Sequence, residues 1–577
     1  MTAPTHDLVV RGALVVDGTG APGRDADVAV TDGRITQVGD VVGRGADELD
    51  GRGQVLAPGF IDPHTHLDAN LFWDPDVTPS ATYGVTTVVT GNCGYTLAPV
   101  ATTAARDYVV DVMSFVEQIP RAAFDTAVPF DWSTQTEYFD RLAELPVALN
   151  HATFVGHVPV RTAVMGPGPA HEREATTDEV ARMVALVREG LALGAVGFST
   201  DQCIGNFGPG FEALPGQVCA PGELLAIAAT LRDAAGPGVF AMVPPSLNQD
   251  RPEREADVDW HLRLAEASGR PVVIGPVFDR WSDLGIGVDM IDLMAARSRP
   301  GVTVVPQIST RIFELWTRLD TMGLVVRLLP TLGDAVRRGG ADGVRALAAD
   351  PERRARLAGE GARVQGNMVW SGRWDHVRLR WSVTRPDLLG LTIDEIAARL
   401  GGAPTDVLVD LAVADDFETQ VAAEMANGDD EQVGRMVGHP ASMIGASDAG
   451  AHVLSNTDSC YAVWTLQHWV RERGVLTLEQ AVRKLTADQA DLFGLSDRGR
   501  VAVGTAADLV LFDPDRVGTV GVRFLDDQPA GGRRLVTEAT GITASVVNGT
   551  VTTRDGAPTG ARAGRFLRPG RTAGSGG

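Results

Sequence analysis

Residues 58–68 read PGFIDPHTHLD and join a short apolar strand to a pair of histidines. Phe60 and Ile61 form the apolar part, and His64 and His66 follow. Because alternate residues of an extended chain point to the same side, both imidazoles can face one ligand. Two imidazoles on one face suit Zn²⁺ or a similar borderline metal. The stretch therefore predicts a metal site at the end of a strand.

Both ends of the chain share a sequence pattern that the middle lacks. Residues 7–57 hold short apolar runs separated by glycine turns, such as DLVVRGALVVDGTG, and residues 500–556 repeat this pattern. Runs of this kind predict short β-strands and hairpins. We therefore expect residues 1–57 and 500–567 to form one small β-sandwich domain, built from both termini around a larger central domain, residues 58–499.

The central residues alternate short buried runs with longer helical segments. Strand-like runs such as VTTVVTG, AVGFST, PVVIGPV and VTVVPQ are separated by segments such as TDEVARMVALVREGLALG. This alternation predicts βα units around a parallel sheet, and about eight such units favour a closed barrel. The expected fold class is therefore α/β, a (β/α)₈ TIM-like barrel. Residues 316–435 are irregular and charged, which predicts an insertion, and residues 568–577 are expected to form a disordered tail.

A second strand-like run ends in GASDAGAH, residues 445–452, just before an amphipathic helix and the C-terminal β-rich segment. Its glycine-rich turn presents Asp448. A carboxylate at the end of a barrel strand can ligate a metal and exchange a proton with a metal-bound water. The same turn on its own would be typical of a plain Asx-turn. Its position favours the catalytic interpretation, and His452, four residues on, is a candidate to contact the substrate.

A third run, GVTTVVTGNCG at residues 84–94, ends in a cysteine between two glycines. The glycines allow the backbone to approach closely and leave the thiol of Cys93 unobstructed. At the end of a barrel strand this thiol could be a thiolate metal ligand. A free cysteine is equally typical of a small apolar residue in a core. Both interpretations stay open from the sequence.

The composition excludes several classes of function. The formal net charge is −23, with an isoelectric point near 4.9, which argues against nucleic acid and against an anionic membrane surface as partners. No apolar run is long enough to span a membrane, and the N-terminus lacks the pattern of a signal peptide. The four cysteines are sparse and show no CxxC spacing, so we expect reduced thiols and a cytoplasmic protein.

Four blocks of sequence carry a resemblance to a known family. PGFIDPHTHLD, WDPDVTPSATYGVTTVVTGNCG, VGHVPVRTAVMG and GASDAGAHV follow in an order and spacing similar to the D-aminoacylase (N-acyl-D-amino-acid deacylase) branch of the amidohydrolase superfamily, over about residues 7–515. The resemblance implies a metal-bearing barrel with a β-sandwich from both ends. It also implies hydrolysis of an amide bond in a small-molecule substrate by a metal-bound hydroxide, with Asp448 as acid and base.

The sequence departs from that family at two strand ends. Members of the branch carry a histidine after the fifth barrel strand and another after the sixth, whereas the corresponding stretches here read GVFAMVPPSLNQ and PVVIGPVFDR. A carboxylated lysine, which bridges two metals in many superfamily members, is excluded because the only lysine, Lys484, lies in a helical stretch after the last strand. His64, His66 and Asp448 supply three ligands and Cys93 a fourth, so we expect one Zn²⁺ rather than two.

Three further residues are candidates for the site. His157, in GHVPVR, matches a GHxxxR pattern of the family by resemblance, and we assign it a catalytic part, through a hydrogen bond to the substrate or the orientation of a ligand. His151 flanks the same strand end and is assigned to substrate binding. Arg311, after the seventh strand, is placed to clamp a substrate carboxylate. For each of them a purely structural part is the alternative.

These observations favour one function over two alternatives. The favoured interpretation is a metal-dependent hydrolase that cleaves a C–N amide bond and resembles an N-acyl-D-amino-acid deacylase. The first alternative is an enzyme of the same fold that acts on a cyclic amide, a urea or a specialised metabolite, by a hydrolytic or a non-hydrolytic reaction. The second is a metal-free barrel that binds a ligand or a partner. We expect a homo-oligomer.

Overall fold

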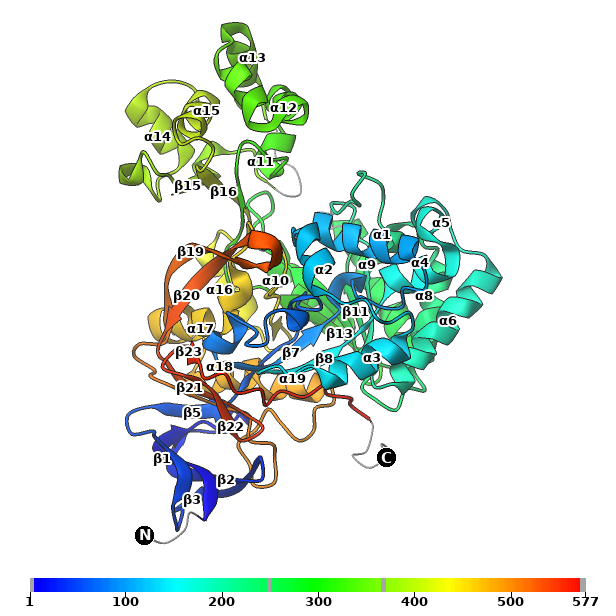
Figure 1. Ribbon diagram of the computed structural model, residues 1–577, viewed down its shortest axis with the longest axis vertical. Coiled ribbons are helices and arrows are strands. Elements are labelled where there is room, and N and C mark those ends of the chain that lie inside the picture. Colours follow the sequence, from blue (N-terminus) through cyan, green and yellow to red (C-terminus); the bar gives the residue numbers. More distant parts are fainter. Residues whose placement is uncertain (1–4, 246–250, 365–369, 571–577) are drawn as a thin grey trace.

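The computed structural model describes residues 5–245, 251–364 and 370–570 (Figure 1). Its central strands are β6 (Phe60–Asp62), β7 (Val85–Thr90), β8 (Asn150–Thr153), β9 (Val155–Gly156), β10 (Gly197–Asp201), β11 (Val239–Val243), β12 (Val272–Val277), β13 (Val304–Ile308) and β17 (Met443–Ile444). They form two parallel sheets, with the orders β6–β7–β8 and β17–β13–β12–β11–β10–β9. The fold is therefore mixed α/β, with parallel strands at its centre.

The two parallel sheets lie next to each other at both ends. A single residue separates β8 from β9 along the chain. Beyond β6, Thr65 forms a parallel bridge with Ala449, which follows β17. The Ser447 hydroxyl lies 2.7 Å from Asp62 Oδ1, to which it donates a hydrogen bond. The first and last of the central strands therefore end side by side.

Helices pack around the central strands (Figure 1). They include α3 (Gln135–Glu144), α4 (His157–Met165), α6 (Thr177–Ala192), α8 (Pro221–Leu231), α9 (Arg251–Ser268) and α10 (Ile286–Arg297). A capping box begins α6, in which the side chains of Thr176 and Glu179 each accept from the other's backbone amide. Because helices cover the strands, the strands are buried on both faces: every residue of β7 is buried.

The two ends of the chain meet in a nine-stranded sheet. Its strands are β1 (His6–Val15), β2 (Arg24–Thr31), β3 (Arg34–Gly39), β4 (Gly45–Asp50), β5 (Val55–Pro58), β18 (Leu509–Phe512), β21 (Ile542–Val547), β22 (Thr550–Arg554) and β23 (Ala557–Pro558). The junction between the ends is the antiparallel pair β5–β18, in which Leu56 is opposite Leu511. Buried side chains from both ends, such as Val10 and Leu509, share one apolar core.

A lobe with its own core projects between β13 and β17 (Figure 1, top). It contains β14 (Phe313–Thr317), β15 (Val377–Trp381), β16 (Gln420–Ala426), α11 (Leu324–Arg327), α12 (Pro330–Ala348), α13 (Pro351–Gly361), α14 (Ile393–Leu400) and α15 (Pro404–Ala414). We call residues 313–426 the insertion lobe. Leu332, Trp370 and Leu408 belong to its apolar core, and Trp316 packs with Leu535 of the hairpin β19 (Gly518–Gln528) and β20 (Gly532–Thr540).

The last described residues run back along the central helices. The Leu567 amide donates to the His151 carbonyl at 2.7 Å, and Arg568 donates to the Phe139 carbonyl at 2.8 Å. The predicted tail thus has its first three residues in described positions, whereas residues 571–577 lie outside the described residues. Within the described part of the chain, every helix is too short or too polar to cross a bilayer.

Candidate metal centre

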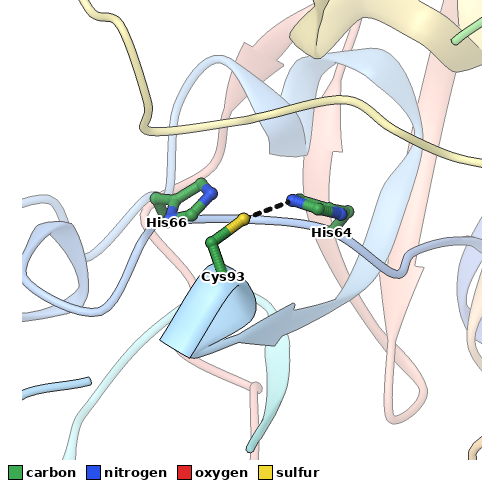
Figure 2. A group of neighbouring side chains, drawn as sticks. All are labelled: His64, His66 and Cys93. Carbon is green, nitrogen blue, oxygen red and sulfur yellow. Dashed lines mark hydrogen bonds between the residues drawn. The ribbon is translucent and has the colours of Figure 1, made fainter. Parts of the chain in front are cut away.

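β6 leads directly into two buried histidines. His64 and His66 are 4% and 1% exposed, and their ring centroids lie 5.6 Å apart (Figure 2). The side-chain oxygen of Gln307, on β13, lies 2.7 Å from His64 Nδ1. Because an amide oxygen can only accept, Nδ1 carries the proton, and the lone pair of the ring is on Nε2. Gln307 therefore fixes the His64 ring with Nε2 as the ligand atom.

Cys93 approaches the same nitrogen from the end of β7. It lies in the 3₁₀ turn Asn92–Gly94 with φ 55°, a left-handed conformation that is costly for a residue with a side chain. The turn is tightly packed, since a Cβ on Gly94 would come within 3.3 Å of the Ser199 carbonyl oxygen. Sγ lies 3.3 Å from His64 Nε2, the contact drawn in Figure 2. Burial raises the pKa of the Cys93 thiol well above its ordinary value, and a coordinated cation would displace the proton.

Asp448 reaches the histidines from the turn after β17. Its Oδ1 lies 3.3 Å from His64 Nε2 and 3.9 Å from His66 Nε2. Like Cys93, Asp448 has a positive φ, of 49°. The turn is pressed against the histidine segment, because a Cβ on Gly450 would lie 2.8 Å from the backbone oxygen of His66. This close approach directs the carboxylate into the site.

Donor atoms of His64, His66 and Cys93 lie close enough together to hold one cation, and the Asp448 carboxylate lies beside them. With usual zinc–ligand distances of about 2.0–2.3 Å, ligand atoms around a tetrahedral centre lie roughly 3.3–3.6 Å apart. His64 Nε2 is 3.3 Å from both Cys93 Sγ and Asp448 Oδ1, and ligand atoms of His64, His66 and Cys93 all lie within 4.8 Å of one another. Burial, with His64 and His452 nearby, lowers the pKa of His66 well below its ordinary value, which keeps the ring in the neutral form that binds metals.

Glu117 is a site residue that the sequence did not reveal. It follows α1 (Thr103–Val116), is 2% exposed, and places Oε1 3.5 Å from His66 Nδ1 and Oε2 3.9 Å from His452 Nε2. Burial, with Asp448 adding to it, raises the pKa of Glu117 well above its ordinary value. A carboxylate behind a ligating histidine orients the ring. The only signal in the sequence was an acidic residue at the end of a helix, which is common without any function.

A cavity of about 1140 Å³ opens onto these donors. Its lining includes His64, His66, Cys93, Glu117, Asp448 and His452. The ends of β11 and β12 contribute Val243 and Pro276, and Phe278 and Arg280 follow β12. These two strand ends are the places where the family resemblance puts histidines, and the described residues at the strand ends themselves, Val243 and Pro276, are apolar. The candidate metal donors therefore share one cavity.

His157 lies behind the site and does not line the cavity. It is fully buried, with Nδ1 2.8 Å from the Thr200 hydroxyl and Nε2 2.8 Å from Glu223 Oε1. The same Glu223 oxygen accepts from Arg161 Nε at 3.0 Å. Both ring nitrogens are thus committed to protein groups. The structure does not bring the residue that we assigned a catalytic part within reach of a substrate in the cavity.

His151 and Arg311 also lie away from the cavity lining. His151 is buried, with Nε2 3.1 Å from the Leu142 carbonyl and its ring stacked on Phe566. Arg311 donates to the backbone oxygen of Thr457 at 2.5 Å and lies over the Trp464 ring. Neither His151 nor Arg311 is therefore placed to contact a substrate in the cavity, as we had expected. Of the residues assigned to substrate binding, His452 alone lines the cavity.

Comparisons with known proteins agree with the resemblance carried by the four sequence blocks. Residues 47–551 match the model of the amidohydrolase family. The D-aminoacylase of Alcaligenes xylosoxydans xylosoxydans is 31% identical over 97% of each chain. The N-acyl-D-aspartate deacylase of the same organism is 32% identical over 89% of this chain and 86% of the relative.

Two solved structures share the architecture. A D-aminoacylase has a TM-score of 0.66 and 29% identity, over 97% of this chain and 99% of its own, and is described as having a binuclear metal centre with one-metal activation and second-metal attenuation. The N-acyl-D-glutamate deacylase from Bordetella bronchiseptica, in complex with zinc and a phosphonate inhibitor, has a TM-score of 0.67 and 26% identity, over 98% and 99% of the two chains. The predicted branch of the superfamily is therefore confirmed.

Proposed function

The chain belongs to the amidohydrolase family, and on that basis we propose that it hydrolyses N-acyl-D-amino acids, or amides closely related to them, with one divalent cation. The relatives supply the class of reaction, since they are named D-aminoacylase and N-acyl-D-aspartate deacylase. One observation carries the proposal: donor atoms of His64, His66, Cys93 and Asp448 converge from three separate strand ends into one cavity.

We infer an eight-stranded (β/α)₈ barrel as the scaffold of this site. β8 and β9 then count as two parts of one strand, and the Thr65–Ala449 bridge supports closure between β6 and β17. We further propose a β-sandwich domain from residues 1–57 and 500–567, because β5 pairs with β18. In such barrels the active site lies at the carboxyl ends of the strands, which is where the four donors lie.

One zinc ion is the occupant that we propose. Nitrogen, sulfur and carboxylate donors suit zinc. The ends of β11 and β12 offer Val243 and Pro276 to the cavity, which supports one metal rather than two. The D-aminoacylase described as activated by one metal and attenuated by a second gives a precedent for single-metal activity.

The chemistry divides between the cation and Asp448. When bound, a divalent cation supplies Lewis acidity that lowers the pKa of a water molecule to roughly 7 and polarises a carbonyl. Asp448 is placed to accept the proton of that water and to deliver it to the departing nitrogen, since its carboxylate faces the cavity beside His64. Gln307 holds the His64 ring through its hydrogen bond, and the Glu117 carboxylate lies 3.5 Å from His66 Nδ1.

We assign to Arg280 the part first expected of Arg311. Arg280 lines the cavity and is 4% exposed. A buried guanidinium in a cavity wall is suited to a substrate carboxylate, which it binds through paired hydrogen bonds. An N-acyl amino acid carries such a carboxylate.

The test combines metal content with turnover. Purified protein should contain one zinc per chain and release amino acid from N-acetyl-D-amino acids, whereas His64→Ala should lose the metal. His439→Ala, whose ring lies 3.2 Å from Asp292 away from the cavity, is the matched control and should keep the metal. Equal metal content in the wild type and His64→Ala would reject the site. Turnover of cyclic amides or ureas, with no deacylation, would favour the alternative substrate class.

A further inference from the structure

The cavity is larger than a short N-acyl amino acid requires. Its volume is about 1140 Å³, whereas pockets that hold drug-sized ligands usually measure roughly 300–1000 Å³. An N-acetyl amino acid is smaller than such ligands. Even the largest natural amino-acid side chain, an indole, leaves most of this space unfilled. The cavity therefore has room for a further part of a substrate.

The insertion lobe, the β19–β20 hairpin and α1 contribute apolar side chains to the lining of the cavity. Phe313 and Leu315 come from β14, Met425 from β16, Phe524 from β19, and Phe115 from α1. Phe313 packs on Phe278 with ring centroids 4.9 Å apart, so this part of the wall is a preformed apolar surface. An insertion that builds such a wall over a hydrolytic site adds affinity for apolar groups in proportion to the area that they bury.

The mouth of the cavity also exposes apolar side chains to solvent. Phe207 and Leu454 line the cavity and are 38% and 41% exposed, and Phe211, in the same segment as Phe207, is 54% exposed. Phe211 contacts Phe115 edge to face, with centroids 5.5 Å apart. Clustered exposed apolar side chains at a cavity mark a site for an apolar ligand.

We propose that the substrate carries a long or bulky apolar acyl group, of about eight carbons or more, that lies against the insertion lobe. This inference rests on the proposed deacylation. The amino-acid side of such a substrate is limited to the size of natural side chains, so the acyl side is the part that can fill the remaining cavity. Leu315 and Met425 line the same cavity and are the side chains against which this acyl group would pack.

A series of N-acyl-D-alanines with acetyl, hexanoyl, octanoyl and decanoyl groups tests the proposal. Each buried methylene adds about fourfold to kcat/KM, because it leaves water for an apolar wall. We expect octanoyl and decanoyl substrates to exceed the acetyl substrate by at least about 100-fold. Equal or falling kcat/KM along the series would overturn the proposal and leave the deacylase function standing.

A matched pair of substitutions locates the acyl site. Leu315→Trp fills the wall and should lower the decanoyl-to-acetyl ratio of kcat/KM by about tenfold or more. Leu389→Trp makes the same change on an exposed surface of the insertion lobe, 43% exposed, and should leave the ratio unchanged. Thermal melting of both variants checks the fold, and Met425→Trp replaces Leu315→Trp if the latter does not fold.

Binding measurements without turnover test the acyl site separately from the deacylase function. Calorimetry with decanoate and with acetate on the metal-loaded protein should give a dissociation constant at least about 100-fold lower for decanoate. Tight decanoate binding with no hydrolysis of any N-acyl-D-alanine would support the acyl site and reject the deacylase function. Equal binding of the two carboxylates would reject the acyl site whatever the turnover.

Discussion

Among the residues that the structure describes, two clusters have the spacing of a metal site, and one of the two lines the cavity. His64, His66 and Cys93 form the first, and His157, Cys219 and Glu223 form the second; in each, the ligand atoms lie within 4.8 Å of one another. The first cluster lines the cavity together with Asp448. In the second, Arg161 already occupies the position of a cation, with its Nε 3.0 Å from Glu223 Oε1.

The difference shows that residue types and spacing do not decide a metal site by themselves. In the second cluster, the Glu223 carboxylate is already paired with His157 and Arg161. Burial raises the pKa of Glu223, but these two neighbours lower it, and the net shift is downward. That pair joins α4 to α8, as a structural bond. In the first cluster, Cys93 Sγ and Asp448 Oδ1 each lie 3.3 Å from His64 Nε2, and all three side chains line the cavity. An open cavity and uncommitted donors are what distinguish the two.

The largest expected effect is on catalysis at the open cluster. Asp448→Asn should lower kcat by about 10³-fold or more, because an amide cannot carry the proton from water to the leaving nitrogen. The melting temperature should stay near that of the wild type. Asp140→Asn on the surface of α3 is the matched control and should be fully active. Steady-state kinetics with a near-normal rate for Asp448→Asn would remove Asp448 from the mechanism.

The closed cluster should respond in stability and not in metal content. Glu223→Gln leaves the buried Arg161 charge without its carboxylate, which costs about 3 kcal/mol or more. We expect a lower melting temperature and unchanged zinc per chain, by calorimetry and elemental analysis. The exposed pair Glu266–Arg299 offers the control, since Glu266→Gln should change stability by less than about 1 kcal/mol. Loss of zinc from Glu223→Gln would make both clusters part of one site.

A smaller effect is expected from the residue behind His64. Gln307→Leu removes the acceptor of the Nδ1 proton and should weaken zinc affinity by about 10–100-fold. Competition with a chromophoric chelator measures this change. Gln37→Leu, on the exposed face of β3, should leave the affinity unchanged. Unaltered affinity in Gln307→Leu would mean that Gln307 does not orient the ring.

The smallest effect is on the difference in unfolding free energy between the wild type and Glu223→Gln, which should depend on pH. We call this difference the stability gap. The pKa of Glu223 is lowered in the folded chain from its ordinary 4.5. Its contribution is therefore present above about pH 4.5 and is lost as the pH falls through the folded value. Melting curves at pH 7 and at pH 3.5 to 4 should show a narrower gap in acid. A gap that widens in acid would contradict an ionised Glu223.

The sequence predicted which four side chains meet in the cavity, but not the residues that pack behind them. His64, His66, Cys93 and Asp448 were proposed as metal donors because each follows a strand-like run, and parallel strands bring their carboxyl ends together. The structure places all four in the lining of one cavity, and their binding of a metal stays a prediction. Glu117 and Gln307 were missed because their contacts depend on how a helix end and a neighbouring strand pack, which leaves no local pattern. His157 carried a family-like motif, yet its ring turns into the core. Arg311 follows its strand end as expected, but its guanidinium turns to Thr457 and Trp464. The cytoplasmic location and the homo-oligomer stay predictions.

The sequence likewise predicted some parts of the fold and missed others. Alternation of strand-like and helical segments predicted the parallel α/β centre. Short apolar runs separated by glycine turns, present at both ends of the chain, predicted that both ends would be β-rich. The pairing of β5 with β18 gives those ends one sheet and one core. The separate apolar core of the insertion lobe was not predicted, because irregular charged segments hide the buried positions, such as Trp370 and Leu408, that build it.

The β5–β18 pair also sets the order in which the protein can be completed. β18 begins about 450 residues after β5 ends, and a ribosome that adds about 5–20 residues per second needs roughly 20–90 s to cover that distance. During this time one edge of β5 has no strand to pair with, and an open strand edge invites pairing with other chains. β5 thus leaves the ribosome long before the strand that covers its free edge, and until then other proteins that bind the nascent chain would have to protect that edge.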